Sequence, residues 1–149
     1  MLSRKEIIEK LISIKKLYTE SYDSMGIITH RFSGKVKTER PSEKEIIFYE
    51  HIRWENEDSL LINARNIYRW TFISPGKIKL EHLRFGENKP LFLVELSKVK
   101  KNTWESIEPH NCNNDLYSAE LSMNDENTVL SWSVKGPTEN YSLKTIYSH

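Results

Sequence analysis

The chain has 149 residues, the usual size of one domain, and carries 22 lysines and arginines against 21 aspartates and glutamates. A net charge of +1 gives no general field that would draw the protein onto nucleic acid or an anionic membrane. Cys112 is the only cysteine, so no internal disulfide can form, which favours a reducing, cytoplasmic location. No stretch approaches ~18 uninterrupted apolar residues, so we expect no membrane span. Charged residues break up the apolar residues of the N-terminus and leave no continuous apolar h-region, so we expect no signal peptide.

The N-terminal residues have the pattern of an amphipathic helix. Ser3 and Glu6 have the spacing of a capping box, in which each side chain bonds the backbone N–H of the other. Apolar residues then recur on one helical face: Ile7, Leu11, Ile14 and Tyr18. We therefore expect a helix from about Arg4 to Tyr18, in an N-terminal segment 1–20 that packs on the rest of the domain.

From about residue 30 the pattern changes to the two-residue alternation of half-buried strands, with turn residues between the stretches. The stretches are 32–36, 45–54, 60–72, 78–82, 91–96, 103–108, 116–123, 129–134 and 141–147. Roughly nine short strands separated by turns favour a sandwich or a barrel. We expect a single domain over 1–149, mainly β, with an antiparallel β-barrel over 30–149 and one N-terminal amphipathic α-helix.

Several segments of the second half have a recognisable order. They are Tyr68-Arg69-Trp70, His110-Asn111-Cys112 with Asp115-Leu116-Tyr117, and Trp132-Ser133-Val134 with Gly136-Pro137 and Tyr141. Over residues 32–147 the chain resembles the family catalogued as domain of unknown function 6314. The resemblance implies a lipocalin-like, calycin-type barrel and implies no established activity.

Two positions depart from the pattern of that family. Val36 stands where the opening strand of the family usually carries a tryptophan. After Gly136-Pro137 the family tends to carry a basic pair, whereas this chain has Thr138-Glu139. A role that needs positive charge at that turn is therefore not expected here.

The first candidate site is a polar cluster whose members lie close together in the sequence: His110, Cys112, Asp115 and Tyr117. A histidine, a thiolate and a carboxylate can hold a transition metal, and a cysteine beside a histidine can be an activated nucleophile. The other interpretation is an Asn/Asp-rich turn in which Cys112 packs as a small apolar side chain. Because no further ligand follows at a diagnostic spacing, we expect no metal and no cofactor.

Aromatic residues on alternating positions are the second candidate. In a barrel, Tyr68, Trp70 and Trp132 either line a ligand cavity or fill the core. Arg65 and Arg69 lie near them in sequence and can fix the polar end of a ligand. Basic and aromatic residues together also suit single-stranded nucleic acid, but the neutral total charge argues against that partner.

The function that these patterns favour is binding of a small, mostly apolar or amphipathic molecule inside the barrel, without catalysis. The residues expected to bind it are Tyr68, Trp70, Arg65, Arg69, His110, Asp115, Tyr117, Trp132 and Tyr141. One alternative is an enzyme that uses His110 and Cys112, or His82 and Glu81, at the barrel mouth. Another is an interaction module that docks a protein through its helix or a sheet edge.

Overall fold

The computed structural model describes residues 2–55, 61–74, 76–112, 114–137 and 139–149. It has one helix, α1 (Arg4–Ile12), before the strands. The strands are β1 (Lys16–Asp23), β2 (Ile28–Ser42), β3 (Glu45–Glu55), β4 (Leu61–Ser74), β5 (Lys77–His82), β6 (Leu91–Lys100), β7 (Thr103–Ser106), β8 (His110–Cys112), β9 (Asp115–Met123), β10 (Thr128–Lys135) and β11 (Asn140–Ser148). No described helix is long and apolar enough to cross a membrane.

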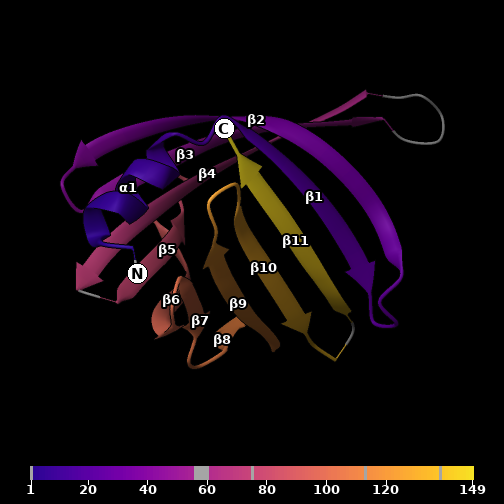
Figure 1. The fold of residues 1–149 in the computed structure, drawn as a ribbon. Helices are drawn as coiled ribbons and strands as arrows, with labels where there is room; N and C mark the ends of the chain where they lie inside the picture. Colours follow the sequence, from indigo (N-terminus) through magenta and orange to yellow (C-terminus); the bar gives the residue numbers. More distant parts are fainter. Residues whose placement is uncertain (1, 56–60, 75, 113, 138) are drawn as a thin grey trace.

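Ten of the strands in the described ranges close into one antiparallel ring (Figure 1). Consecutive strands pair from β1 to β7, then β7 pairs with β9, β9 with β10, β10 with β11, and β11 back with β1. Because β10 occupies one edge of β9, β8 lies on the same edge as β7 and continues its path. The expected antiparallel barrel with one N-terminal helix is confirmed, and its kinship with lipocalins in particular stays a prediction.

The helix is shorter than its sequence pattern predicts. The capping box is present, since the Ser3 hydroxyl accepts from the Glu6 N–H at 3.2 Å and the Glu6 carboxylate accepts from the Ser3 N–H at 3.4 Å. The helix nevertheless ends at Ile12, and Tyr18 lies in β1, 37% exposed. The prediction of a helix to Tyr18 was wrong because residues 16–19 alternate exposed and buried, and pairing with β2 and β11 satisfies their backbone groups.

Helix α1 covers one end of the barrel. Thr38 of β2 donates to the Ile12 carbonyl at 2.9 Å, and Asn102 between β6 and β7 accepts from the Leu2 N–H at 3.3 Å. Lys10 donates to the Asn124 carbonyl, between β9 and β10, at 2.8 Å. The buried face of the helix joins the core with Leu11 fully buried, a burial that contributes about 1.5–3 kcal/mol. At the opposite end, which we call the open end, the described turns carry no such helix.

Strand alternation decides which side chains face the interior. Trp70 pairs with Ile46 and Leu80, and all three are fully buried, so even-numbered residues of β3, β4 and β5 point inward. Most strands are longer than expected, above all β2, which runs over residues 28–42 instead of 32–36, whereas β7 ends at Ser106 instead of residue 108. Its polar, mostly exposed ends carry no apolar alternation, and pairing with β1 and β3 extends it.

Candidate functional site

The half of the interior beneath α1 is filled by apolar and aromatic side chains. The Phe48 ring lies 5.1 Å from the Trp70 ring and 5.4 Å from the Tyr147 ring, between centroids. Trp70 is 0% exposed, and its indole N–H has no hydrogen-bond partner among the described residues. Trp70 is therefore part of the packed core, so the prediction that it lines a ligand site finds no support in its surroundings.

A carboxylate lies at the boundary of this core. Glu50 of β3 alternates with Phe48 and Ile52, so it points inward, and it is only 4% exposed. Tyr147 donates to Glu50 Oε2 at 2.5 Å and Asn66 Nδ2 donates to Glu50 Oε1 at 3.5 Å. No ion pair with Glu50 is formed by any described lysine or arginine. Burial raises the pKa of Glu50 to about 7, against the two hydrogen bonds, which act to lower it.

A chain of hydrogen bonds leads from Glu50 to a histidine nearer the surface. Arg84 donates its backbone N–H to His82 Nδ1 at 3.0 Å, so a neutral imidazole carries its proton on Nε2. His82 Nε2 lies 3.5 Å from Asn66 Oδ1, where it donates, and the other end of that amide donates to Glu50. Burial, and then Arg84, lower the pKa of His82, which favours this neutral form. The buried carboxyl is thus connected to a half-buried ring through one amide.

Tyr68 lies beside this cluster. Its ring meets His82 edge-on, with 5.1 Å between centroids. Burial raises the pKa of the Tyr68 phenol, and the Glu50 carboxylate raises it further, so the hydroxyl stays protonated and close to that carboxylate. The described residues give this hydroxyl no hydrogen bond of standard geometry, which leaves a donor for another molecule.

Several inward positions nearer the open end are half-buried, among them Trp132 and Leu143, although Val134 and Ala119 beside them are buried. Trp132 pairs with Leu143 and Ala119, and one step further along Val134 pairs with Tyr117 and Tyr141. Trp132 packs against the core from this side, together with Phe32, Ala64 and Tyr68. These residues are apolar or aromatic, half-buried, and at inward positions of their strands.

The rim of this end joins three residues of the predicted set. Burial, followed by Tyr117, Glu139 and Asp115, raises the pKa of Tyr141, so these groups lie close together. A side chain at Gly136 would collide with the Asp115 carboxylate, which explains the glycine after β10. The Asp-x-Tyr and Gly-Pro segments of the sequence therefore meet at one place.

Other predicted residues lie elsewhere. Strand alternation places Arg65 and Arg69 on the outer face, and Arg69 Nε donates to Glu81 at 3.0 Å. The expectation that these arginines reach the polar end of the interior was therefore wrong. Glu81 and His82 also point to opposite faces, which removes them as a catalytic pair.

His110 lies in a surface hollow of about 510 Å³ instead of the interior. Its ring meets Phe92 edge-on at 5.1 Å between centroids, and Ile107 and Asn111 line the same hollow. The side chain of Cys112 and the whole of Thr138 lie outside the described residues, so the expectations that involve them stay predictions. Among the residues described, no three histidines, cysteines, aspartates or glutamates lie together in a way that could hold a metal ion.

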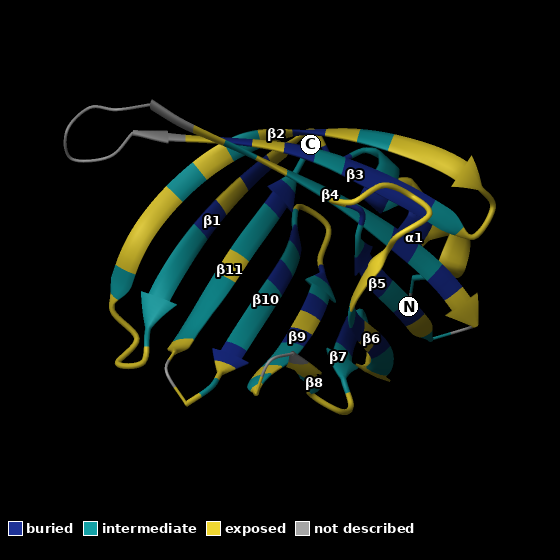
Figure 2. Ribbon diagram, turned by 180° about the vertical axis from the view of Figure 1, so that it is seen from behind, coloured by how far each residue is buried: buried dark blue, intermediate teal, exposed yellow. Residues whose placement is uncertain are grey.

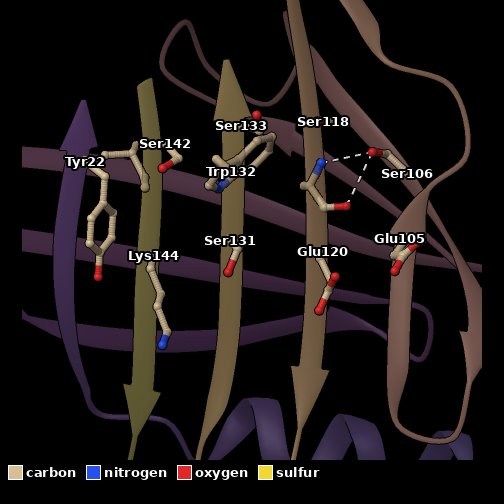
Figure 3. Close-up of a pocket in the computed structure, with 12 residues that line it drawn as sticks. Tyr22, Glu105, Ser106, Ser118, Glu120, Ser131, Trp132, Ser133, Ser142 and Lys144 are labelled. Atoms are coloured by element: carbon tan, nitrogen blue, oxygen red, sulfur yellow. Dashed lines mark hydrogen bonds between the residues drawn. The ribbon is translucent and has the colours of Figure 1, made fainter. Parts of the chain in front are cut away.

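A second hollow, of about 580 Å³, lies on the outer face of β9, β10 and β11 (Figure 3). Ser118, Ser133 and Ser142 form a row across the three strands, with Tyr22 at one end. The next row contains Lys144, Ser131 and Glu120. No histidine is among the described residues that line this hollow, so these hydroxyls can make hydrogen bonds but have no described imidazole base to activate them.

Sequence reasoning missed Glu50, Asn66 and Tyr147. The sequence of β3 contains a sign of Glu50's role. Every second residue of this strand is apolar and buried, namely Ile46, Phe48 and Ile52, except at the position of Glu50. A charged residue at a buried position of a strand is informative. Burying a charge costs free energy unless the charge is paired, so such a residue points to a partner or to a function.

The chain belongs to the family described as "Family of unknown function (DUF6314)", whose model matches residues 17–149. No curated protein matches the chain. Among solved structures it is similar to EF1p2_mFAP2b bound to DFHBI, with 10% identity, 93% of this chain and 94% of that chain covered, and a TM-score of 0.46. It is also similar to a protein of unknown function from Bacteroides ovatus, with 10% identity, 91% and 40% covered, and a TM-score of 0.29. At these scores the two structures carry no argument about function.

Proposed function

We propose that this member of the DUF6314 family binds a small, mostly apolar molecule in the open half of its barrel, with a basic or hydrogen-bond-donating group of that molecule directed to Glu50. The observation that carries the proposal is the Glu50 carboxylate, which is only 4% exposed and forms no ion pair with a described lysine or arginine. Half-buried aromatic side chains lie on the same side of the core. Small-molecule sites typically combine an apolar wall with a few polar groups of this kind.

The energetic cost of Glu50 supports a role beyond folding. A pKa raised from 4.5 to about 7 corresponds to about 3 kcal/mol of lost stability once the carboxyl is ionised. A glutamine in the same place would make similar hydrogen bonds without that cost. Strongly perturbed ionisable groups inside a concave region are typical of functional sites.

The chemistry around Glu50 favours one class of ligand. A protonated amine or an amidine would pair with the carboxylate away from water, where the attraction is stronger than at a surface. The Tyr68 hydroxyl offers one further hydrogen bond, and Trp132 and Phe32 offer apolar contact for a flat or branched body. An acid of the same shape would meet Glu50 with like charge and is expected to bind weakly.

A titration with matched probes tests the proposal. Tryptamine, indole-3-ethanol and indole-3-acetic acid share one ring and differ in the polar group, and their binding is measured by calorimetry at pH 7.5. We expect tryptamine to bind saturably, the alcohol more weakly and the acid least. Glu50→Gln should weaken tryptamine at least tenfold, while Glu45→Gln, on the outer face, serves as the matched control. Equal affinities for the three probes, or an unchanged affinity in Glu50→Gln, would contradict the proposal.

A further inference from the structure

Four basic residues form a row across the outside of the barrel. Lys16 of β1 pairs with Lys35 of β2, Lys35 with His51 of β3, and His51 with Arg65 of β4. Since neighbouring strands lie about 4.8 Å apart, the row is about 14 Å long. Its members alternate with inward residues such as Glu50, so the side chains point outward, and all four are exposed. Figure 2 shows β2, at the middle of this face, mostly in the colour of exposed residues.

The surface around the row is also basic. A hollow of about 570 Å³ lies over it, lined by Lys15, Lys37 and Tyr49 as well as by Lys35, His51 and Arg65. Arg53 lies two residues beyond His51 on the same face. Glu50, whose side chain points inward, is also among the residues that line the hollow. On its outer side, two described carboxylates lie near Tyr49, which donates to Glu39 at 2.9 Å and whose pKa Glu87 also raises.

These cations are unpaired within the described part of the chain. None of Lys15, Lys16, Lys35, Lys37, Arg53 and Arg65 forms an ion pair there, whereas Arg69 on the same strand as Arg65 contacts both Glu81 and Glu45. Like charges directly opposite one another in a sheet are destabilising, and Lys16 and Lys35 are such a pair. A chain with 22 basic and 21 acidic residues has enough carboxylates to neutralise this face. The separation of charge therefore indicates an anionic partner.

We propose that this basic row binds the phosphates of single-stranded nucleic acid. Cations in a line over an open sheet suit a linear polyanion, because a small phosphate would be held by cations and N–H groups that converge on one point. Two tyrosines flank the row on the same face: Tyr18, 37% exposed, pairs with Ser33 on one side, and Tyr49 pairs with Lys37 on the other. Aromatic rings beside a basic groove are stacking platforms for unpaired bases. The net charge of +1 excludes a general field, but it does not exclude this local one.

Fluorescence anisotropy with a labelled twelve-residue oligothymidylate tests this site. We expect saturable binding at low salt, with a slope of log K against log salt of about −2 to −3, since each neutralised phosphate of a single strand contributes about 0.7. Lys35→Glu with Arg65→Glu should weaken binding at least tenfold. The control is Lys135→Glu with Lys144→Glu, two exposed residues on β10 and β11. This double variant changes the net charge equally, and we expect it to weaken binding by no more than about twofold.

Three outcomes would overturn the proposal. They are no saturable binding at low salt, equal weakening by the two double variants, and equal competition by polyglutamate or inorganic polyphosphate at matched charge. Tyr18→Leu gives a second readout, because it should weaken binding several-fold with an unchanged salt slope. The tryptamine titration of Lys35→Glu with Arg65→Glu should match that of the wild type, so a failure of this site is distinguishable from a failure of the interior one.

Discussion

The two halves of the barrel interior differ in what fills them. Beneath α1, the described rings and aliphatic side chains pack with no described charged group among them, and Phe48, Trp70 and Tyr147 are almost fully buried. Toward the open end, several inward positions are half-buried, and polar groups appear: the buried Glu50 is joined to Asn66 and His82 in one hydrogen-bonded chain. The Tyr147 hydroxyl, which bonds Glu50, is the point where the two halves meet.

This difference separates stability from function within one fold. The helix-side half can be packed tightly because nothing has to enter it, and the helix excludes water from it. The open half includes an ionisable group that weakens the fold near neutral pH, a cost that a binding site explains and a structural core does not.

The largest expected effect comes from removing a ring from the packed half. Trp70→Ala should destabilise the protein by about 3–5 kcal/mol, because the surrounding core cannot collapse into the space. Trp132→Ala, at a half-buried position, should cost less than half as much. Urea unfolding of both variants measures the difference. Equal losses would mean that the interior is packed uniformly from end to end.

The next effect is a change in the pH dependence of stability. The folded state raises the pKa of Glu50 from 4.5 to about 7, so folding takes up a proton between these values and stability falls as pH rises through that window. Glu50→Gln removes this fall, and it should stabilise the protein by up to about 3 kcal/mol at pH 8 and by little at pH 4. Thermal unfolding of both proteins over pH 4 to 8 provides the check. A variant less stable than the wild type at pH 8 would show that the carboxylate is well solvated or paired.

A smaller effect is expected at the rim. Gly136→Ala places a methyl group against the Asp115 carboxylate, which must move, and we expect a loss of about 1–3 kcal/mol. Asp115→Ala in the same chain should restore most of that loss, because it removes the atoms that collide. A double-mutant cycle in urea measures the coupling, and additive effects would refute the contact.

The smallest effect is at the start of the helix. Ser3→Ala removes one half of the capping box and should cost about 1 kcal/mol. If α1 closes the barrel end as described, Ser3→Ala should also increase binding of a hydrophobic dye to the packed half. A change in stability without a change in dye binding would mean that the helix end frays locally.

Much of the fold could be predicted because alternation in the strands carries it. Apolar residues recur at every second position, as Ile78 and Leu80 do in β5 and Trp70 and Phe72 do in β4. This alternation predicts which face of each strand is buried, and turn residues predict where the strands end. The boundary between helix and β1 could not be predicted, since Leu17 continues the apolar pattern under either period. Only the pairing of residues 16–23 with β2 and β11 decides it.

The candidate site was predicted less well. The inward positions of Tyr68 and Trp132 could be predicted, because aromatic residues in strand alternation are visible in the sequence. That these residues and Tyr117 bind a ligand stays a prediction. The expectation that Arg65 and Arg69 reach the interior was wrong, because the alternation that points Tyr68 and Trp70 inward puts the two arginines outside. The meeting of Glu50 with Tyr147, 97 residues apart, depends on barrel closure, which no local pattern reveals.

The protonation of Glu50 is the most direct test of the division between the two halves. A titration of its carboxyl carbon by NMR, on protein labelled at glutamate, can be assigned with the Glu50→Gln variant. We predict a pKa of about 7 in the free protein, and a pKa several tenths lower or more when tryptamine is bound, because an ammonium group stabilises the carboxylate. A pKa near 4.5 in the free protein, unchanged by tryptamine, would contradict the account.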